Sequence, residues 1–307
     1  MRASWRWMTI AVALGVVVTT ASVGGFATVT GAAGPTSYVA LGDSYTAGPV
    51  IPTQQATPLG CLKSDHTYPH LLAVALQVAT FHDASCSGAT TDNMTNPQNV
   101  TPGPNPPQFG SLDPTTQLVT VGIGGNDVGL FDILVHCFSP TPAGTPCQDQ
   151  YDSGGNDQIS NRITATAPKV AAVLQGIHTR SPVARVLLVG YLAILPESGP
   201  GCYSQLPFTP GDVPYLRAKE KELNAMLAQQ AAANNATFID AYTASIGHDA
   251  CQPFCRRWVE PLTPASPAAP VHPNLAGMLG TAAAVLGEPP PQSPAECPVS
   301  AAPRFTG

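Results

Sequence analysis

Five short apolar runs alternate along the chain with longer segments whose apolar residues recur at helical spacing. The runs lie at residues 38–42, 79–84, 117–123, 185–191 and 236–240, and a near-continuous apolar run of this length is typical of a strand covered on both faces. Segments with helical periodicity lie at residues 68–76, 128–135, 157–179, 214–233 and 274–285. This alternation predicts a parallel sheet sandwiched between helices.

Polar residues refine these predicted helices. Thr67 and Asp127 each precede an apolar segment and are expected to cap it. On the segment 214–233, the expected outward face carries the charged residues Lys219, Glu220, Lys221 and Glu222. Loops are expected at 49–58, 96–107, 137–155 and 196–211, and the tail beyond Gly287 is rich in proline.

The amino-terminal segment predicts export. Arg2 and Arg6 precede an apolar run from Met8 to Val18, and small residues follow as far as residue 33, which is the organisation of a cleaved secretory signal. The alternative is an uncleaved membrane anchor. We therefore expect a signal peptide at 1–33, one main globular domain at 34–287 and a proline-rich tail at 288–307.

Composition and cysteine usage agree with an extracellular protein. Only 10% of the 307 residues are charged and the net charge is −6, so nothing favours nucleic-acid binding. Eight cysteines indicate four disulfides in an oxidising compartment. Sequence alone leaves 105 pairings, and neighbourhood favours Cys61–Cys86, Cys137–Cys147, Cys202–Cys251 and Cys255–Cys297. No spacing suggests a zinc site, and the segment 152–157 lacks the spacing of a calcium loop, so no cofactor is expected.

Three predicted strands end in small polar motifs. Gly42-Asp43-Ser44 follows the first strand, Gly88 follows the second and Asn126 follows the third. Read singly, each is an ordinary turn or a helix cap. Because parallel strands place their carboxyl ends on one sheet edge, the three motifs are expected to converge. A serine nucleophile with backbone and amide donors is what acyl transfer requires.

A histidine must then act as the base for Ser44. His272 stands immediately before the last predicted helix, where it can lean over the strand ends, and we favour it. His248, after the fifth strand, is the second choice. The remaining histidines, His66, His70, His82, His136 and His178, have no accompanying motif.

These motifs together resemble the SGNH (GDSL-type) esterase and lipase family. The matching blocks are Gly42-Asp43-Ser44, Gly88, Gly124-Gly125-Asn126-Asp127 and His272-Pro273-Asn274, in the family's order. The chain is most similar to secreted actinobacterial lipases and esterases. The resemblance implies an α/β/α sandwich with a five-stranded parallel sheet, and it supports the first three disulfides named above.

One position departs from the family pattern. The wider family often carries Asp three residues before the catalytic histidine, where this chain has Ala269. Some secreted relatives resemble dyads in which a backbone carbonyl orients the imidazole. Ala269 or Pro270 is the expected source of that oxygen, because the chemistry needs only an acceptor for the Nδ1–H group.

The resemblance implies a secreted serine esterase or lipase. Ser44 would form the acyl-enzyme with His272 as base, and the oxyanion would be held by the N–H groups of Ser44 and Gly88 and the side chain of Asn126. The expected substrate is an acyl lipid or phospholipid ester, handled by a monomer with transient lipid-surface contact. The alternatives are a carbohydrate O-deacetylase, an acyltransferase and a non-catalytic lipid- or glycan-binding protein.

Overall fold

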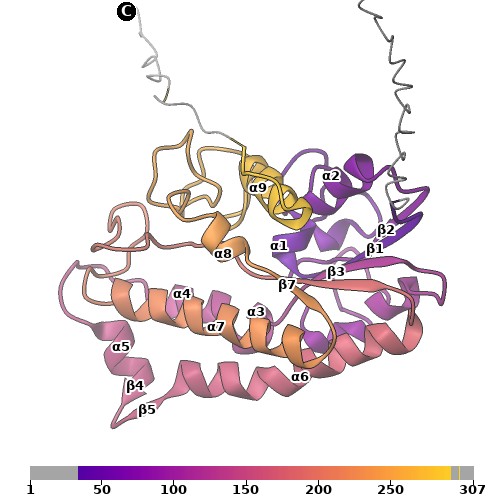
Figure 1. Cartoon of the computed structure of the whole chain (residues 1–307). Coiled ribbons are helices and arrows are strands. Elements are labelled where there is room, and N and C mark those ends of the chain that lie inside the picture. The colour runs from indigo at the N-terminus through magenta and orange to yellow at the C-terminus, as the bar shows by residue number, and fades with distance from the viewer. Residues whose placement is uncertain (1–33, 292–296, 298–307) are drawn as a thin grey trace, which may run out of the picture. The chain divides into compact units, whose positions relative to one another are not determined.

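The computed structural model describes residues 34–291 and residue 297, and within them a five-stranded parallel sheet forms the centre of the fold (Figure 1). Its strands are β1 (Ser37–Gly42), β2 (Thr80–Asp83), β3 (Leu118–Gly122), β6 (Arg185–Val189) and β7 (Thr237–Ile239). Their spatial order is β2-β1-β3-β6-β7, with every neighbouring pair parallel. The predicted α/β/α sandwich with a five-stranded parallel sheet is therefore confirmed.

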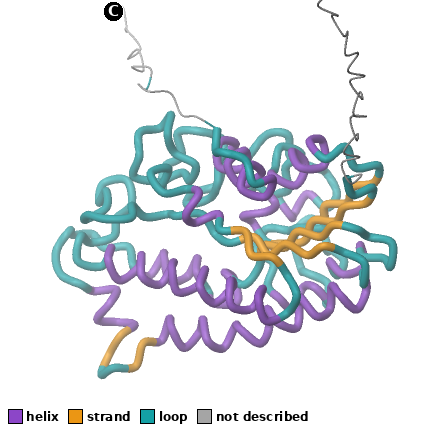
Figure 2. Tube along the Cα trace, viewed as in Figure 1, coloured by secondary structure: helices purple, strands orange, loops and turns teal. Residues whose placement is uncertain are grey.

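Helices cover both faces of this sheet (Figures 1 and 2). The helices α6 (Gln158–Arg180) and α7 (Val213–Ala233) pack together below the sheet in the view of Figure 1, and α2 (Tyr68–Ala75) and α9 (Leu275–Leu286) pack together above it. Helical coverage on both faces explains why β1, β3 and β6 are almost wholly apolar and buried.

Shorter elements complete the described part of the chain. The short α-helices are α1 (Ser44–Ala47), α3 (Gly125–Val128), α4 (Leu130–His136), α5 (Pro146–Tyr151) and α8 (Ala241–Ala244). A two-stranded hairpin joins β4 (Asp152–Ser153) to β5 (Asn156–Asp157), and single 3₁₀ turns lie at Leu59–Cys61, Thr91–Met94 and Gln108–Ser111. The predicted loop at 137–155 was thus wrong in part, because it contains α5 and half of this hairpin.

Two predicted polar positions also differ in the structure. Asp127 does not cap α4: it lies inside α3 and accepts hydrogen bonds from the N–H and hydroxyl of Thr91, at 2.9 and 2.6 Å. Glu220 does not face solvent, because its carboxylate is buried and accepts a 2.7 Å bond from the N–H of Ile194. In both cases the side-chain carboxyl group accepts a hydrogen bond from a backbone N–H outside the predicted helix.

Disulfides fasten the loops around the sheet. The structure pairs Cys61 with Cys86, Cys137 with Cys147, Cys202 with Cys251 and Cys255 with Cys297, which are the four pairs expected from the sequence. The predicted signal peptide, and the predicted tail apart from residues 288–291 and 297, lie outside the described residues. Within residues 34–291, every helix is too short or too polar to span a bilayer.

Candidate active site

Ser44 begins α1 directly after β1, at the carboxyl edge of the sheet. Asp43 caps this short helix, since its Oδ1 atom accepts a 2.9 Å hydrogen bond from the N–H of Tyr45. Gly42 has φ of +153°, and a Cβ there would lie 2.3 Å from the hydroxyl of Thr46 and 2.8 Å from the carbonyl of Gly122. The turn that presents Ser44 therefore requires a glycine at position 42.

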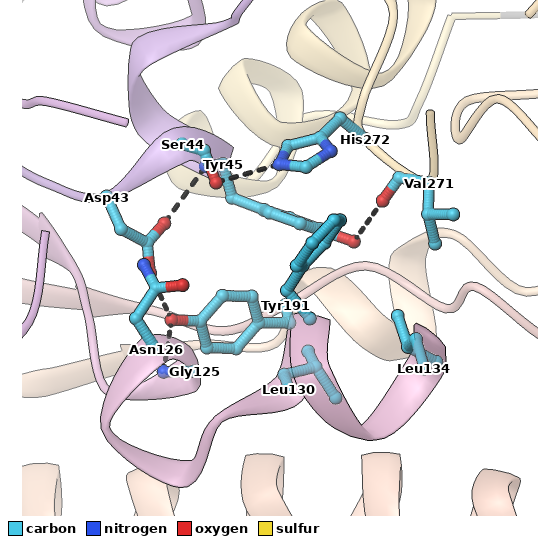
Figure 3. Close-up of a pocket in the computed structure, with 11 residues that line it drawn as sticks. Asp43, Ser44, Tyr45, Gly125, Asn126, Leu130, Leu134, Tyr191, Val271 and His272 are labelled. Carbon is cyan, nitrogen blue, oxygen red and sulfur yellow. Dashed lines mark hydrogen bonds between the residues drawn. The ribbon is translucent and has the colours of Figure 1, made fainter. Parts of the chain in front are cut away.

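His272 meets Ser44 in the structure (Figure 3). Its Nε2 atom lies 2.8 Å from the Ser44 hydroxyl, and its Nδ1 atom lies 2.7 Å from the carbonyl oxygen of Pro270. A carbonyl only accepts, so Nδ1 carries the proton and the lone pair of Nε2 faces the serine. Of the two candidate carbonyls, that of Pro270 accepts from the ring, whereas that of Ala269 accepts from the His272 backbone N–H at 3.2 Å.

The backbone around His272 is held from several sides. The Tyr45 hydroxyl donates to the Val271 carbonyl at 2.9 Å (Figure 3). The Val271 N–H donates to the Glu260 carbonyl, and the Glu260 N–H donates to the His272 carbonyl, both at 3.0 Å. Burial lowers the pKa of His272 below its ordinary 6.5, and the Pro270 acceptor opposes that effect in part. The imidazole is thereby kept neutral and oriented.

His248, the second choice from the sequence, has a different environment. Its ring stacks on the indole of Trp258 with centroids 4.3 Å apart, and its Nδ1 atom donates to the Arg256 carbonyl at 2.7 Å. Neither contact leads to Ser44. His248 is therefore placed in the loop packing around Trp258 and not in the serine site.

The three expected oxyanion donors come from three different strand ends. Among the hydrogen bonds of residues 34–291, none uses the backbone N–H of Ser44 or Gly88 as a donor, and Gly88 adopts a left-handed φ of +79°. The Asn126 amide nitrogen donates one bond, of 2.9 Å, to the Ala89 carbonyl. Because an amide nitrogen carries two hydrogens, one remains for a ligand.

A tyrosine that the motif analysis missed links two of these turns. The Tyr191 hydroxyl donates to Oδ2 of Asp43 at 2.5 Å and accepts from the Gly125 N–H at 2.7 Å (Figure 3). Burial raises the pKa of Asp43 to about 7, although the Tyr191 hydroxyl and the Tyr45 N–H both oppose that rise. Tyr191 is the last residue of the fourth predicted strand, which ends at the same sheet edge as Ser44 and Asn126, and that position was the available signal.

A cavity opens beside Ser44 and His272. Its polar side is formed by Asp43, Ser44, Asn126 and His272, and its apolar side by Leu130, Phe131, Leu134 and Val271 (Figure 3 labels all but Phe131). No group of three or more His, Cys, Asp or Glu side chains suited to a metal ion occurs in the described part of the chain. The arrangement offers a hydroxyl, a base and hydrogen-bond donors beside an apolar surface.

The chain is similar to known proteins over most of its length. The sequence model of the GDSL-like lipase/acylhydrolase family matches residues 40–279. Lipase 2 of Streptomyces coelicolor is 40% identical over 247 residues, covering 78% of this chain and 81% of that protein. Two solved structures, phospholipase A1 of Streptomyces albidoflavus NA297 and an extracellular lipase of Streptomyces rimosus, superpose with TM-scores of 0.69 and 0.68. Each is 26% identical and covers 82% of this chain and 98% of its own.

Proposed function

The chain belongs to the GDSL-like lipase/acylhydrolase family and is a carboxylic ester hydrolase, and we propose that it cleaves acyl esters of lipids outside the cell through an acyl-enzyme on Ser44. The observation that carries this proposal is the 2.8 Å contact between the Ser44 hydroxyl and Nε2 of a histidine whose Nδ1 atom is already bonded to a carbonyl. That arrangement is the nucleophile, base and orienting acceptor of serine hydrolysis.

In this mechanism His272 removes the Ser44 proton as the hydroxyl oxygen attacks the ester carbonyl. The tetrahedral oxyanion is held by the N–H groups of Ser44 and Gly88 and by the Asn126 amide. His272 then gives that proton to the ester oxygen as its bond to the carbonyl carbon breaks, so the alcohol leaves and the acyl group stays on Ser44. A water molecule then hydrolyses the acyl-enzyme by the same steps. His272 takes a proton from the water as its oxygen attacks the acyl carbon, and Ser44 leaves as a hydroxyl carrying that proton.

Two features support the assignment of the oxyanion donors. The Ser44 and Gly88 N–H groups have no acceptor among the bonds described above, and buried or cleft donors without partners are uncommon unless a ligand or water uses them. Asn126 is held by the Ala89 carbonyl, one residue after Gly88, so its amide and the Gly88 N–H are positioned relative to each other. Donors fixed before the reaction need no reorganisation during it.

Lipid esters and an extracellular location are supported by independent features. The apolar side of the cavity is suited to an acyl chain, and α4 exposes Phe131 and Val135 beside it, with exposed fractions of 59% and 45%. Such a patch is suited to transient contact with a lipid surface. Export is supported by the four disulfides and by the signal-like residues 1–33.

The proposal is tested by mass spectrometry of the secreted protein after reaction with a fluorophosphonate probe. We expect one adduct, on Ser44, and hydrolysis of p-nitrophenyl esters that is lost in the Ser44→Ala and His272→Ala variants. Folding of each variant is checked by circular dichroism and by the absence of free thiols. A folded, fully disulfide-bonded protein that gives no adduct on Ser44, or that keeps its activity in Ser44→Ala, would overturn the mechanism.

The same samples separate the candidate substrates. Rates that rise with acyl-chain length support a lipid ester, whereas turnover confined to acetyl esters, including acetylated sugars, would replace it with a carbohydrate O-deacetylase. Product analysis with an added alcohol acceptor distinguishes hydrolysis from acyl transfer. Detection of the mature amino terminus in the culture medium, starting near residue 34, tests the proposed export.

A further inference from the structure

A second cavity lies behind the apolar wall of the site. It is lined mainly by aliphatic side chains of α4, α6 and α7, including Ile133, Ile163 and Leu223, and also by Lys219 and Glu220 of α7. Leu130 and Leu134 line both this cavity and the cavity beside Ser44. Four residues apart on α4, they lie one above the other on the same face of the helix and form a partition between the two spaces.

The opposite side of the site has a different character. Beyond Asn126 the surface opens into a wide cleft of mixed lining. Apolar side chains such as Met94 and Phe109 line it together with Thr91 and the Asp127–Lys169 ion pair, whose charged atoms lie 3.6 Å apart. An acyl chain placed there would lie against charged and hydroxyl groups as well as apolar ones, and apolar surface beside charged groups stays partly in water. The more uniformly apolar direction for a chain attached to Ser44 therefore runs toward α4.

Both cavities are small in the resting structure. The one beside Ser44 has a volume of about 40 Å³ and the one behind the partition about 20 Å³. A single water-sized sphere needs roughly 10–15 Å³, so the second space cannot hold several methylene groups while both leucines stand in place. The side chains of Leu130 and Leu134 therefore close the path along which a longer chain would run.

We propose that Leu130 and Leu134 set the acyl-chain length that this enzyme accepts, and that removing either side chain admits longer chains into the cavity behind them. This inference rests on the proposed function, since it takes Ser44 as the point of attachment. In the wild-type protein the acyl chain ends at the partition, and further methylene groups remain in water. In a truncated variant these groups bury against Ile133, Ile163 and Leu223.

The expected effect follows from the size of the side chain removed. Leucine has three more carbons than alanine, which is room for about three methylene groups, and each buried methylene favours binding roughly fourfold. For Leu134→Ala we therefore expect kcat/KM for long-chain esters, relative to acetate, to rise about 10- to 60-fold over wild type. Leu134→Val should give a smaller rise, and Leu130→Ala one similar to Leu134→Ala.

The experiment measures kcat/KM for p-nitrophenyl esters from acetate to palmitate, using the secreted protein as isolated from the culture medium and its variants. Leu174→Ala is the matched control, because Leu174 is a fully buried leucine of α6 that lines neither cavity. The double variant Leu134→Ala/Ile163→Phe refills the second cavity, and its chain-length profile should return toward that of wild type. Fluorophosphonate labelling of Ser44 is measured in every variant.

The outcomes are separable from those for the mechanism. Loss of Ser44 labelling in the wild type would overturn the proposed function itself. Normal labelling with parallel profiles for wild type, Leu134→Ala and Leu130→Ala would overturn the partition alone. An equal gain in Leu174→Ala, or a gain in Leu134→Ala that survives Ile163→Phe, would assign the effect to general loosening of the core and would also overturn it.

Discussion

The Tyr191→Phe substitution tests whether one hydroxyl holds two turns of the site in register. It removes a single oxygen that donates to Asp43 at 2.5 Å and accepts from Gly125 at 2.7 Å. Asp43 and Gly125 are both buried, and they directly precede Ser44 and Asn126. The phenyl ring stays, so the contact with Tyr45, at 5.1 Å between ring centroids, is kept.

The cost to stability follows from the two groups left without partners. A buried N–H without an acceptor costs about 1–3 kcal/mol, and a lost hydrogen bond to a carboxylate costs about 1.5–3 kcal/mol. We expect the free energy of unfolding to fall by roughly 2.5–6 kcal/mol. Asp43 also loses a donor that favours its charged form, so its pKa should rise further above about 7.

The effect on catalysis follows from position and not from contact with the reacting atoms. Because the hydroxyl ties the Ser44 turn to the Asn126 turn, its loss lets the nucleophile and the oxyanion donor drift apart. A misplacement of about 1 Å can cost on the order of a hundredfold. We expect kcat on a short ester to fall about 10- to 100-fold with KM changed less than about threefold, and fluorophosphonate labelling of Ser44 to slow in parallel.

Urea unfolding, steady-state kinetics and labelling rates on the same samples check these values. Tyr203→Phe is the matched control, since the Tyr203 hydroxyl donates one bond, of 2.8 Å, to the Ser139 carbonyl and does not line the site. It should lose about 0.5–1.5 kcal/mol and no activity. If Tyr191→Phe is destabilised but keeps the kcat of wild type, the hydroxyl has no positioning role. If its stability is also unchanged, the bridge described here is wrong.

Three further outcomes are expected. Asn126→Ala should lower kcat about 10²- to 10³-fold with the fold intact, and unchanged turnover would remove Asn126 from the oxyanion site. The acid limb of the kcat/KM profile should have its midpoint below pH 6.5, because burial lowers the pKa of His272; a midpoint above that pH would contradict the buried, neutral imidazole. Burial raises the pKa of Glu220 from 4.5 to about 8. Between these pH values the folded state holds a proton that the unfolded state releases, so the free energy of unfolding should fall as the pH rises, by up to about 5 kcal/mol. Glu220→Gln keeps an acceptor for Ile194 and should make this fall less steep in urea unfolding, above all near pH 7–8, while the contribution of Asp43, whose pKa is raised to about 7, remains. An equally steep fall in the variant would show that Glu220 does not contribute to it.

The sheet could be predicted from the sequence because its central strands are buried on both faces. Each such strand therefore appears in the sequence as an apolar run. The ends of such strands also predicted Ser44, Gly88 and Asn126 as one group, since parallel topology brings them to one edge. His272 was added because it stands just before the last predicted helix. Side chains whose partners come from distant loops were not predictable in this way. By local pattern Glu220 belongs to a charged helix face. In the structure it is buried, and it accepts a hydrogen bond from the N–H of Ile194, which lies 26 residues earlier in the chain.

The region at 137–155 shows the same limit. Its glycines, prolines and serines indicated a loop, but Pro146 stands at the start of α5, where a proline has no N–H bond to lose, and Cys147 is tied to Cys137. The helix is only six residues long. Its existence depends on tertiary contacts, among them the bonds from the N–H groups of Cys147 and Gln148 to Asp212, at 3.2 and 2.9 Å, and local pattern does not carry that information.

The absence of a carboxylate at Ala269 then has a physical explanation. The third member of a serine triad must accept from Nδ1–H and hold the ring in place. Here the Pro270 carbonyl is the acceptor, and other hydrogen bonds hold the loop in place. The Ala269 N–H donates to the Pro49 carbonyl, and the Val271 carbonyl accepts from the Tyr45 hydroxyl. Backbone hydrogen bonds also join Glu260 to Val271 and His272. A neutral carbonyl stabilises the imidazolium less than a carboxylate would, and burial acts in the same direction. The base therefore stays unprotonated to lower pH, at the expense of some stabilisation of the charge that forms on it during attack.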